Sequence, residues 1–151
     1  MKRHGFTLLE LAIVLAIVAL TTTLVVPQLR DPRARVLSIT ARQLADTLSL
    51  ARDRAILRSR PTAIVFDLDT HRWRTDDAGD RPVALPPDVR LSRITIGGRA
   101  AITDGQVTLA LQPAGDLLPT TIDLRDDRGR AARVVLPPAR ARALVLPQER
   151  S

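Results

Sequence analysis

Glu10 is the residue of this sequence whose chemistry is hardest to accommodate. It carries the one charge between Phe6 and Val26, a run of 21 residues. As a helix this run would be about 30 Å long, close to the hydrocarbon thickness of a bilayer. A carboxylate one turn inside such an apolar segment is costly unless a cation neutralises it. We therefore expect Glu10 to pair with a cation, such as an ammonium group.

The residues around Glu10 form a motif. A basic leader containing Lys2 and Arg3 is followed by Gly5-Phe6-Thr7-Leu8-Leu9-Glu10. This order resembles the class III signal of type IV pilins and type II secretion pseudopilins. The resemblance implies that a prepilin peptidase cuts after Gly5 and methylates the new amino terminus on Phe6. It also implies that Glu10 pairs with the amino terminus of a neighbouring subunit during filament assembly.

Three plainer interpretations of the apolar run explain less. A secretory signal peptide has a shorter apolar region, of 7–15 residues, and a small-residue cleavage site that the run lacks. A simple membrane anchor accounts for the length but gives no reason for Gly5 or Glu10. A soluble core helix would need apolar cover on all faces.

With Lys2 and Arg3 on the cytoplasmic side, the carboxyl-terminal part is expected in the periplasm, outside the inner membrane.

Residues that could support catalysis or bind metal are sparse. The chain has no cysteine and two histidines, His4 and His71, and its serines lie in no nucleophile motif. The aspartates at 76, 77 and 80 lack the spacing of a calcium loop. Asp67 and Asp69 bracket a predicted turn, which explains them without catalysis. We therefore expect no enzyme activity, no metal site and no cofactor, and we expect Trp73 to belong to the core.

The elements that position Glu10 follow from the hydrophobic period. The sequence predicts a leader over 1–5, a transmembrane helix over 6–26 and an amphipathic helix over 27–60. Pro27 predicts a helix kink, because proline removes a backbone hydrogen bond and clashes with the preceding turn. The second helix should end near Ser59, before Pro61. Its apolar stripe steps by three or four residues: Leu37, Ala41, Leu44, Leu48, Ala51 and Ala55.

A β-rich periplasmic head is predicted over 61–151. After Pro61 the period changes to two, and turn residues separate about seven or eight short strands. In the clearest example, Gln106 to Gln112, the apolar residues Val107, Leu109 and Leu111 share one face. Asp126 to Gly129 should close a hairpin. The fold class is therefore α+β and pilin-like: a long amino-terminal helix, half transmembrane and half amphipathic, packed on a mostly antiparallel sheet.

The junction between helix and head extends the resemblance. Leu48-x-x-Ala51-Arg52-x-x-Ala55-Ile56, followed by a strand ending Phe66-Asp67, resembles the GspH/FimT family of minor pseudopilins and minor pilins. The resemblance implies a minor pseudopilin, a structural subunit of the type II secretion pseudopilus. Its implied partners are prepilin peptidase, the other major and minor pseudopilins, and inner-membrane lipid.

An alternative is a FimT-like minor pilin of a type IV pilus, involved in pilus assembly or DNA uptake. The formal net charge is +7, but residues 61–127 carry seven arginines against eleven aspartates. Only the amphipathic helix and the tail are basic. DNA would be bound through phosphates by the tail arginines: Arg128, Arg130, Arg133, Arg140 and Arg142. The plainer interpretation is that this sequence simply prefers arginine, with 22 arginines and one lysine.

Overall fold

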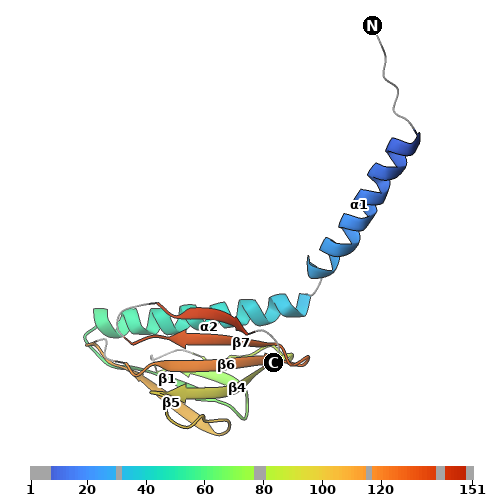
Figure 1. Ribbon diagram of the computed structural model, residues 1–151. Helices are drawn as coiled ribbons and strands as arrows, with labels where there is room; N and C mark the ends of the chain where they lie inside the picture. The colour runs from blue at the N-terminus through green and yellow to red at the C-terminus, as the bar shows by residue number, and fades with distance from the viewer. Residues whose placement is uncertain (1–7, 30–31, 77–80, 115–116, 139–141, 149–151) are drawn as a thin grey trace. The chain divides into compact units, whose positions relative to one another are not determined.

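The structure is a computed structural model that describes residues 8–29, 32–76, 81–114, 117–138 and 142–148. The side chains of residues 20–29, 32–34 and 147–148 lie outside this description. The chain divides into two compact units, Met1–Pro32 and Arg33–Ser151, which are considered separately below. Figure 1 shows the elements along the chain.

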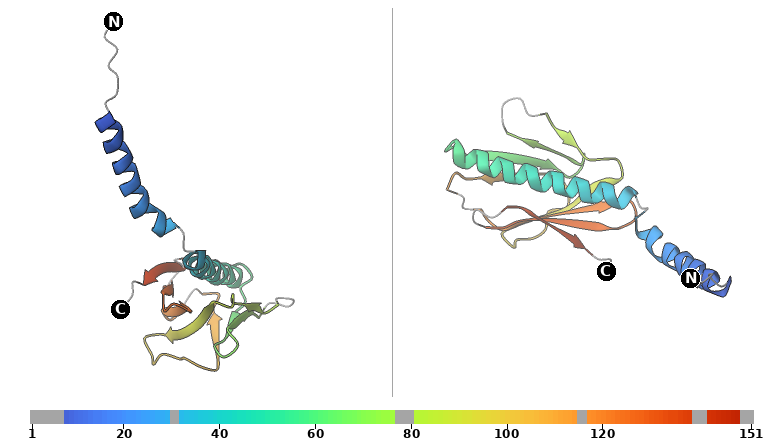
Figure 2. Two further views of the ribbon diagram at one scale, coloured as in Figure 1. Left: turned by 90° about the vertical axis from the view of Figure 1, so that its right-hand side faces the viewer. Right: turned by 90° about the horizontal axis from the view of Figure 1, so that it is seen from above.

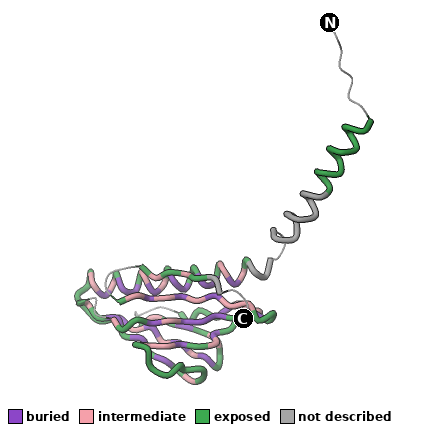
Figure 3. The backbone as a smooth tube through the Cα atoms, viewed as in Figure 1, coloured by how far each residue is buried: buried purple, intermediate pink, exposed green. Residues whose placement is uncertain are grey.

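The first unit contains helix α1, Leu8–Leu29. Its described side chains, from residue 8 to residue 19, are all exposed (Figure 3). No helix within the described part of the chain meets the length and hydropathy expected of a membrane crossing. The helix extends three residues beyond the expected boundary at Val26. The expected kink at Pro27 stays a prediction, because the side chains there lie outside the described residues.

Helix α2, Pro32–Leu57, belongs to the second unit except for its first residue. Pro32 occupies the first helical position, which suits a residue with a fixed φ and no N–H to donate. The helix ends two residues before the expected Ser59. The N–H of Arg60 donates to the carbonyl of Ala55, and the N–H of Ser59 to that of Ile56. Ser59 has a φ of 49°. This left-handed residue and its two hydrogen bonds form a Schellman cap immediately before Pro61.

Within the described residues, eight strands follow α2 and form two antiparallel four-stranded sheets. The sheet with order β3-β2-β1-β5 contains β1 (Thr62–Asp67), β2 (Arg72–Thr75), β3 (Val83–Ala84) and β5 (Gln106–Leu111). The sheet with order β4-β6-β7-β8 contains β4 (Val89–Ile96), β6 (Thr120–Asp126), β7 (Ala131–Leu136) and β8 (Leu144–Gln148). Strand β4 has a register shift between Leu91 and Arg93 where it pairs with β6.

One core joins α2 to both sheets. All six residues of the predicted stripe are buried, with at most 5% of their surface exposed. They belong to one hydrophobic cluster with side chains from both sheets, including Phe66 of β1 and Leu124 of β6. Figure 2 shows α2 running lengthwise over the strands, and Figure 3 shows its buried side facing them. The packing of this stripe on the head's own strands is therefore confirmed.

Most of the expected strands are present, and the division into two sheets is the main difference. Val107, Leu109 and Leu111 are buried while Thr108 and Ala110 are exposed, as their alternation predicts. The predicted hairpin joins β6 to β7 across a turn in which Gly129 has a φ of 77°. His71 lies in the turn before β2 and has a φ of 52°.

Candidate functional site

The described surface of α1 is apolar on every side. At 100° per residue its exposed large side chains are distributed around the whole helix rather than along one stripe. They are Leu8, Leu9, Leu11, Ile13, Val14, Leu15, Ile17 and Val18, each at least 48% exposed. A helix with this surface requires apolar cover from outside its own unit, either lipid or other helices.

Glu10 lies in the first turn of this apolar helix and is exposed with its neighbours. Cover that removes water from Leu9 and Leu11 would also desolvate the carboxylate between them. Desolvation raises the cost of the charge unless a cation arrives with the cover. The pairing of Glu10 with a cation from a covering partner stays a prediction. Gly5 and Phe6, the expected sites of cleavage and methylation, lie outside the described residues.

Two of the tail arginines are already engaged by carboxylates. Arg133 lies opposite Asp123 in the β6–β7 ladder. Its Nε and Nη2 donate to the two carboxylate oxygens at 2.7 and 3.0 Å. This bond raises the pKa of the Arg133 guanidinium. Arg130 donates from Nε to Asp126.

These pairs reduce the set of arginines proposed for DNA. Arg128 and Arg142 are exposed, and Arg140 lies outside the described residues. A guanidinium held by a carboxylate would have to exchange partners before binding a phosphate. The arrangement therefore favours a structural role for Arg130 and Arg133.

Asp126 organises the turn between β6 and β7. Its Oδ1 accepts from the backbone N–H of Arg128 at 3.0 Å and of Arg130 at 2.8 Å. Burial alone would favour the neutral acid. The side-chain hydrogen bond from Arg130 and the two backbone donors outweigh burial and hold the pKa of Asp126 below its usual value.

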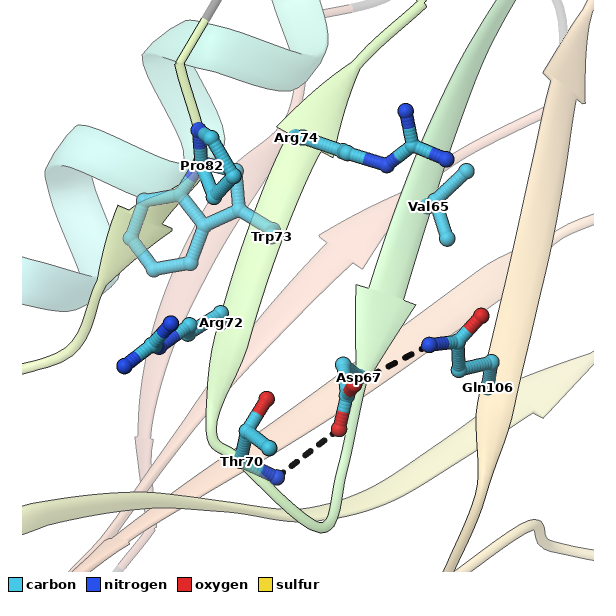
Figure 4. Close-up of a pocket in the computed structure, with 8 residues that line it drawn as sticks. All are labelled: Val65, Asp67, Thr70, Arg72, Trp73, Arg74, Pro82 and Gln106. Atoms are coloured by element: carbon cyan, nitrogen blue, oxygen red, sulfur yellow. Dashed lines mark hydrogen bonds between the residues drawn. The ribbon is translucent and has the colours of Figure 1, made fainter.

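Asp67 and Asp69 serve the loops at one end of their sheet, as turn chemistry predicts. Asp67 accepts from the backbone N–H of Thr70 at 2.8 Å and from the side chain of Gln106 at 3.1 Å (Figure 4). The bond from Thr70, followed by that from Gln106, holds the pKa of Asp67 below its usual value. Asp69 accepts from the backbone N–H of Gly105 at 3.1 Å. These contacts join the β1–β2 turn to the start of β5.

The sequence predicted no catalytic or metal-binding role for Trp73 or for the aspartates at 76, 77 and 80. Trp73 is 3% exposed and belongs to the core, as predicted. Asp76 is exposed, whereas Asp77 and Asp80 lie outside the described residues. Within the described ranges, no group of three or more histidine, cysteine, aspartate or glutamate residues is placed to hold a metal ion.

The burial of Arg52 was not predicted from the sequence. It is 3% exposed, and its Nη2 donates to the backbone carbonyl of Pro137 at 2.9 Å. Arg52 occupies the position next to Ala51 in the buried stripe. That neighbourhood is the one signal in the sequence that could have indicated burial.

Comparisons with known proteins agree with this architecture. The family model described as type II transport protein GspH matches residues 40–139. The model described as the prokaryotic N-terminal methylation motif matches residues 1–26. The type II secretion system protein H of Escherichia coli (strain K12) is 38% identical over 88 residues, covering 55% of this chain. This chain spans about half of that relative's length, 49%.

Two solved structures of the minor pseudopilin EpsH, from the type II secretion system of Vibrio cholerae, share the fold. One has a TM-score of 0.60 and covers 78% of this chain and 98% of its own. The other has a TM-score of 0.56 and covers 74% and 96% respectively. Both are 19% identical to this chain. At that identity the likeness concerns the fold, including the helix and the antiparallel strands.

Proposed function

We propose a function for this chain from the premise that it belongs to the GspH family of type II transport proteins, whose model matches residues 40–139. The chain is a minor pseudopilin, a structural subunit of the type II secretion pseudopilus that takes part in protein secretion across the outer membrane. The exposed apolar surface of α1 with Glu10 in its first turn is the observation that carries this proposal.

The precursor is inserted with its leader, residues 1–5, in the cytoplasm. Residues 6–26 are held in inner-membrane lipid, and the head lies in the periplasm. The match of residues 1–26 to the methylation motif supports processing there. Prepilin peptidase cuts between Gly5 and Phe6 and methylates the amino group of Phe6. This step produces the amino terminus that the filament uses.

During assembly the apolar helix leaves the lipid and is covered by the helices of other pseudopilins. Glu10 then pairs with the amino terminus of a neighbouring subunit, which fixes their relative position along the filament. The pair offsets the desolvation of both charges, because neither is left alone in the apolar bundle. The role requires no catalytic residue in this chain.

The alternative, a FimT-like minor pilin of a type IV pilus, would share the processing and the helix. The engagement of Arg130 and Arg133 by carboxylates disfavours its DNA-binding form. The experiment is deletion of the gene in its own host, with and without a wild-type copy. We expect a type II substrate to be retained in the periplasm and its secretion to be restored by the copy. Normal secretion together with loss of surface pili would support the alternative.

A further inference from the structure

Two cavities adjoin β2, one on the face of its sheet that is turned away from the core and one beside α2. The first, of about 270 Å³, is lined by residues of β1, β2 and β5 and by Pro82 (Figure 4). The second, of about 200 Å³, lies between α2 and the segment containing β2 and β3. Trp73 and Arg74 line both cavities. The two cavities therefore adjoin at β2, and together they are treated as one surface feature.

Four arginines from three parts of the chain line this feature, which we call the basic groove. They are Arg54 of α2, Arg72 and Arg74 of β2, and Arg81 before β3. Among its described lining residues, Asp67 is the one carboxylate, and it already accepts from Thr70 and Gln106. The groove is thus strongly positive, although it lies mostly within residues 61–127, which carry more aspartates than arginines.

The β2 register explains why the two central arginines lie on the same face. Arg72 lies opposite Asp67, and Arg74 lies opposite Val65. Alternation along the strand exposes both arginines and buries Trp73 between them. Within the described residues, the structure shows no carboxylate paired with Arg72, Arg74 or Arg81. These guanidinium groups are consequently available to an anion from outside the chain.

The groove also offers a buried donor and apolar surface. Trp73 is 3% exposed, and its Nε1 has no hydrogen-bond partner in the described part of the chain. A buried donor normally has a partner, so this indole is a second sign that a polar group is missing from the site. Val83 and Leu50, which line the second cavity, are 39% and 51% exposed.

We propose that the basic groove docks an acidic segment of a partner protein, in which carboxylates alternate with apolar side chains. The carboxylates would bind Arg72 and Arg74, since guanidinium forks recognise carboxylates with paired hydrogen bonds. The apolar side chains would cover Leu50 and Val83. A nucleic acid fits less well, because the two cavities, of about 270 and 200 Å³, have the size of single side chains. The choice of a protein partner rests on the proposed function.

The test uses the purified full chain in detergent and three fluorescently labelled probes at low salt. They are an acidic peptide of alternating aspartate and leucine, a neutral peptide of alternating asparagine and leucine, and a DNA duplex. Anisotropy of each probe measures binding. The emission of Trp73, the one tryptophan in the sequence, reports binding in the groove. We expect the acidic peptide to bind, to change this emission, and to be released as salt is raised.

The double variant Arg72→Gln/Arg74→Gln should bind the acidic peptide about tenfold or more weakly, because two charge-assisted contacts are lost. The matched control is Arg90→Gln/Arg93→Gln, two exposed arginines of β4 in the other sheet. It should bind like the wild type. Equal binding by both double variants, no binding of the acidic peptide at low salt, or tighter binding of the duplex at the same arginines would overturn the proposal. None of these outcomes depends on a secretion phenotype, so the failure of this proposal is distinguishable from the failure of the proposed function.

Discussion

Arg52 of α2 donates from Nη2 to the backbone carbonyl oxygen of Pro137, 2.9 Å away and 85 residues later in the sequence. The bond fastens the helix to the chain immediately after β7. Burial lowers the pKa of the Arg52 guanidinium, and the nearby charge of Asp53 acts in the opposite direction. Arg52 thus connects α2 to the end of β7, two elements that lie far apart in the sequence. The apolar stripe of α2 alone would not specify this position of the helix along the strand.

Replacing this arginine should destabilise the head. Arg52→Ala removes the donor to Pro137 and the packed stem, so we expect the free energy of unfolding to fall by about 2–4 kcal/mol. Urea unfolding followed by Trp73 fluorescence would measure the change. Arg42→Ala, at an exposed position of the same helix, is the control and should change stability by less than about 0.5 kcal/mol. Equal effects of the two substitutions would contradict the assigned contact.

The turn around Asp126 predicts a pH dependence. Because the folded pKa of Asp126 is lowered, its contribution to stability is present above the unfolded pKa of about 3.9 and is lost as pH falls through the folded value. At pH 7, Asp126→Asn should reduce the free energy of unfolding by about 1–3 kcal/mol. The difference from wild type should shrink below about pH 4. Asp46→Asn, on the exposed side of α2, serves as the control. A difference in free energy of unfolding between wild type and Asp126→Asn that stays constant with pH would contradict the role given to the Asp126 carboxylate.

The cap of α2 predicts opposite effects of one substitution at two serines. Ser59 has a φ of 49°, a conformation that glycine adopts without strain. Ser59→Gly should therefore raise the free energy of unfolding by about 0.5–1 kcal/mol. Ser38→Gly, within α2, should lower it by a similar amount, about 0.5–1 kcal/mol, because glycine is a poor helix former. Thermal unfolding of the two variants measures both signs, and destabilisation by Ser59→Gly would argue against the cap.

Some features of the fold could be predicted from the sequence and others could not. The stripe from Leu37 to Ala55 and the alternation from Val107 to Leu111 could be predicted, because burial on one face repeats with the period of the helix or strand. The hairpin at Gly129 could also be predicted, because the residues from Asp126 to Gly129 are typical of a turn. The division into two sheets could not, because β5 returns to pair with β1 while β4 pairs with β6. Such pairings depend on tertiary packing rather than on a local pattern.

The basic groove shows the same limit for charge. A count along residues 61–127 gives a net negative segment. The fold nevertheless brings Arg74 and Arg81 to the same cavity as Arg54 of the preceding helix, while Arg72 lines the adjoining cavity. Arg52 was also missed, because arginine is seldom fully buried. By contrast, the need of Glu10 for a neutralising cation could be predicted from the sequence, because Glu10 is the one charge in a long apolar run.

The assembly role of Glu10 predicts a specific defect. Glu10→Ala should still insert and be processed, but it should enter the pseudopilus poorly, because the neighbouring amino terminus would lose its anionic partner. Glu10→Asp retains the carboxylate and should assemble better than Glu10→Ala. Sheared pseudopili from a strain producing each variant, quantified by immunoblot against total protein, would measure incorporation. Equal incorporation of wild type and Glu10→Ala would contradict the proposed pairing of Glu10 with the amino terminus of a neighbouring subunit.

Processing at Gly5 has its own variant. A bulky residue, as in Gly5→Phe, should prevent cleavage, because the peptidase recognises the small residue before Phe6 according to the family resemblance. The precursor would then accumulate with slower electrophoretic mobility. Ala100→Phe, which adds a bulky side chain at an exposed position outside the helices and strands of the head, is the control for bulk alone. A normally processed band from Gly5→Phe would place the cleavage elsewhere.

The central claim is that this chain matures as a pilin-type filament subunit. It is tested most directly by intact mass and amino-terminal sequencing of the protein from membranes of a host with a prepilin peptidase. We predict a mature chain that begins at Phe6 and carries one added methyl group on its amino terminus. A chain that begins at Met1, or one cut near Thr23, would contradict the claim, because neither has the amino terminus that the filament role of Glu10 requires.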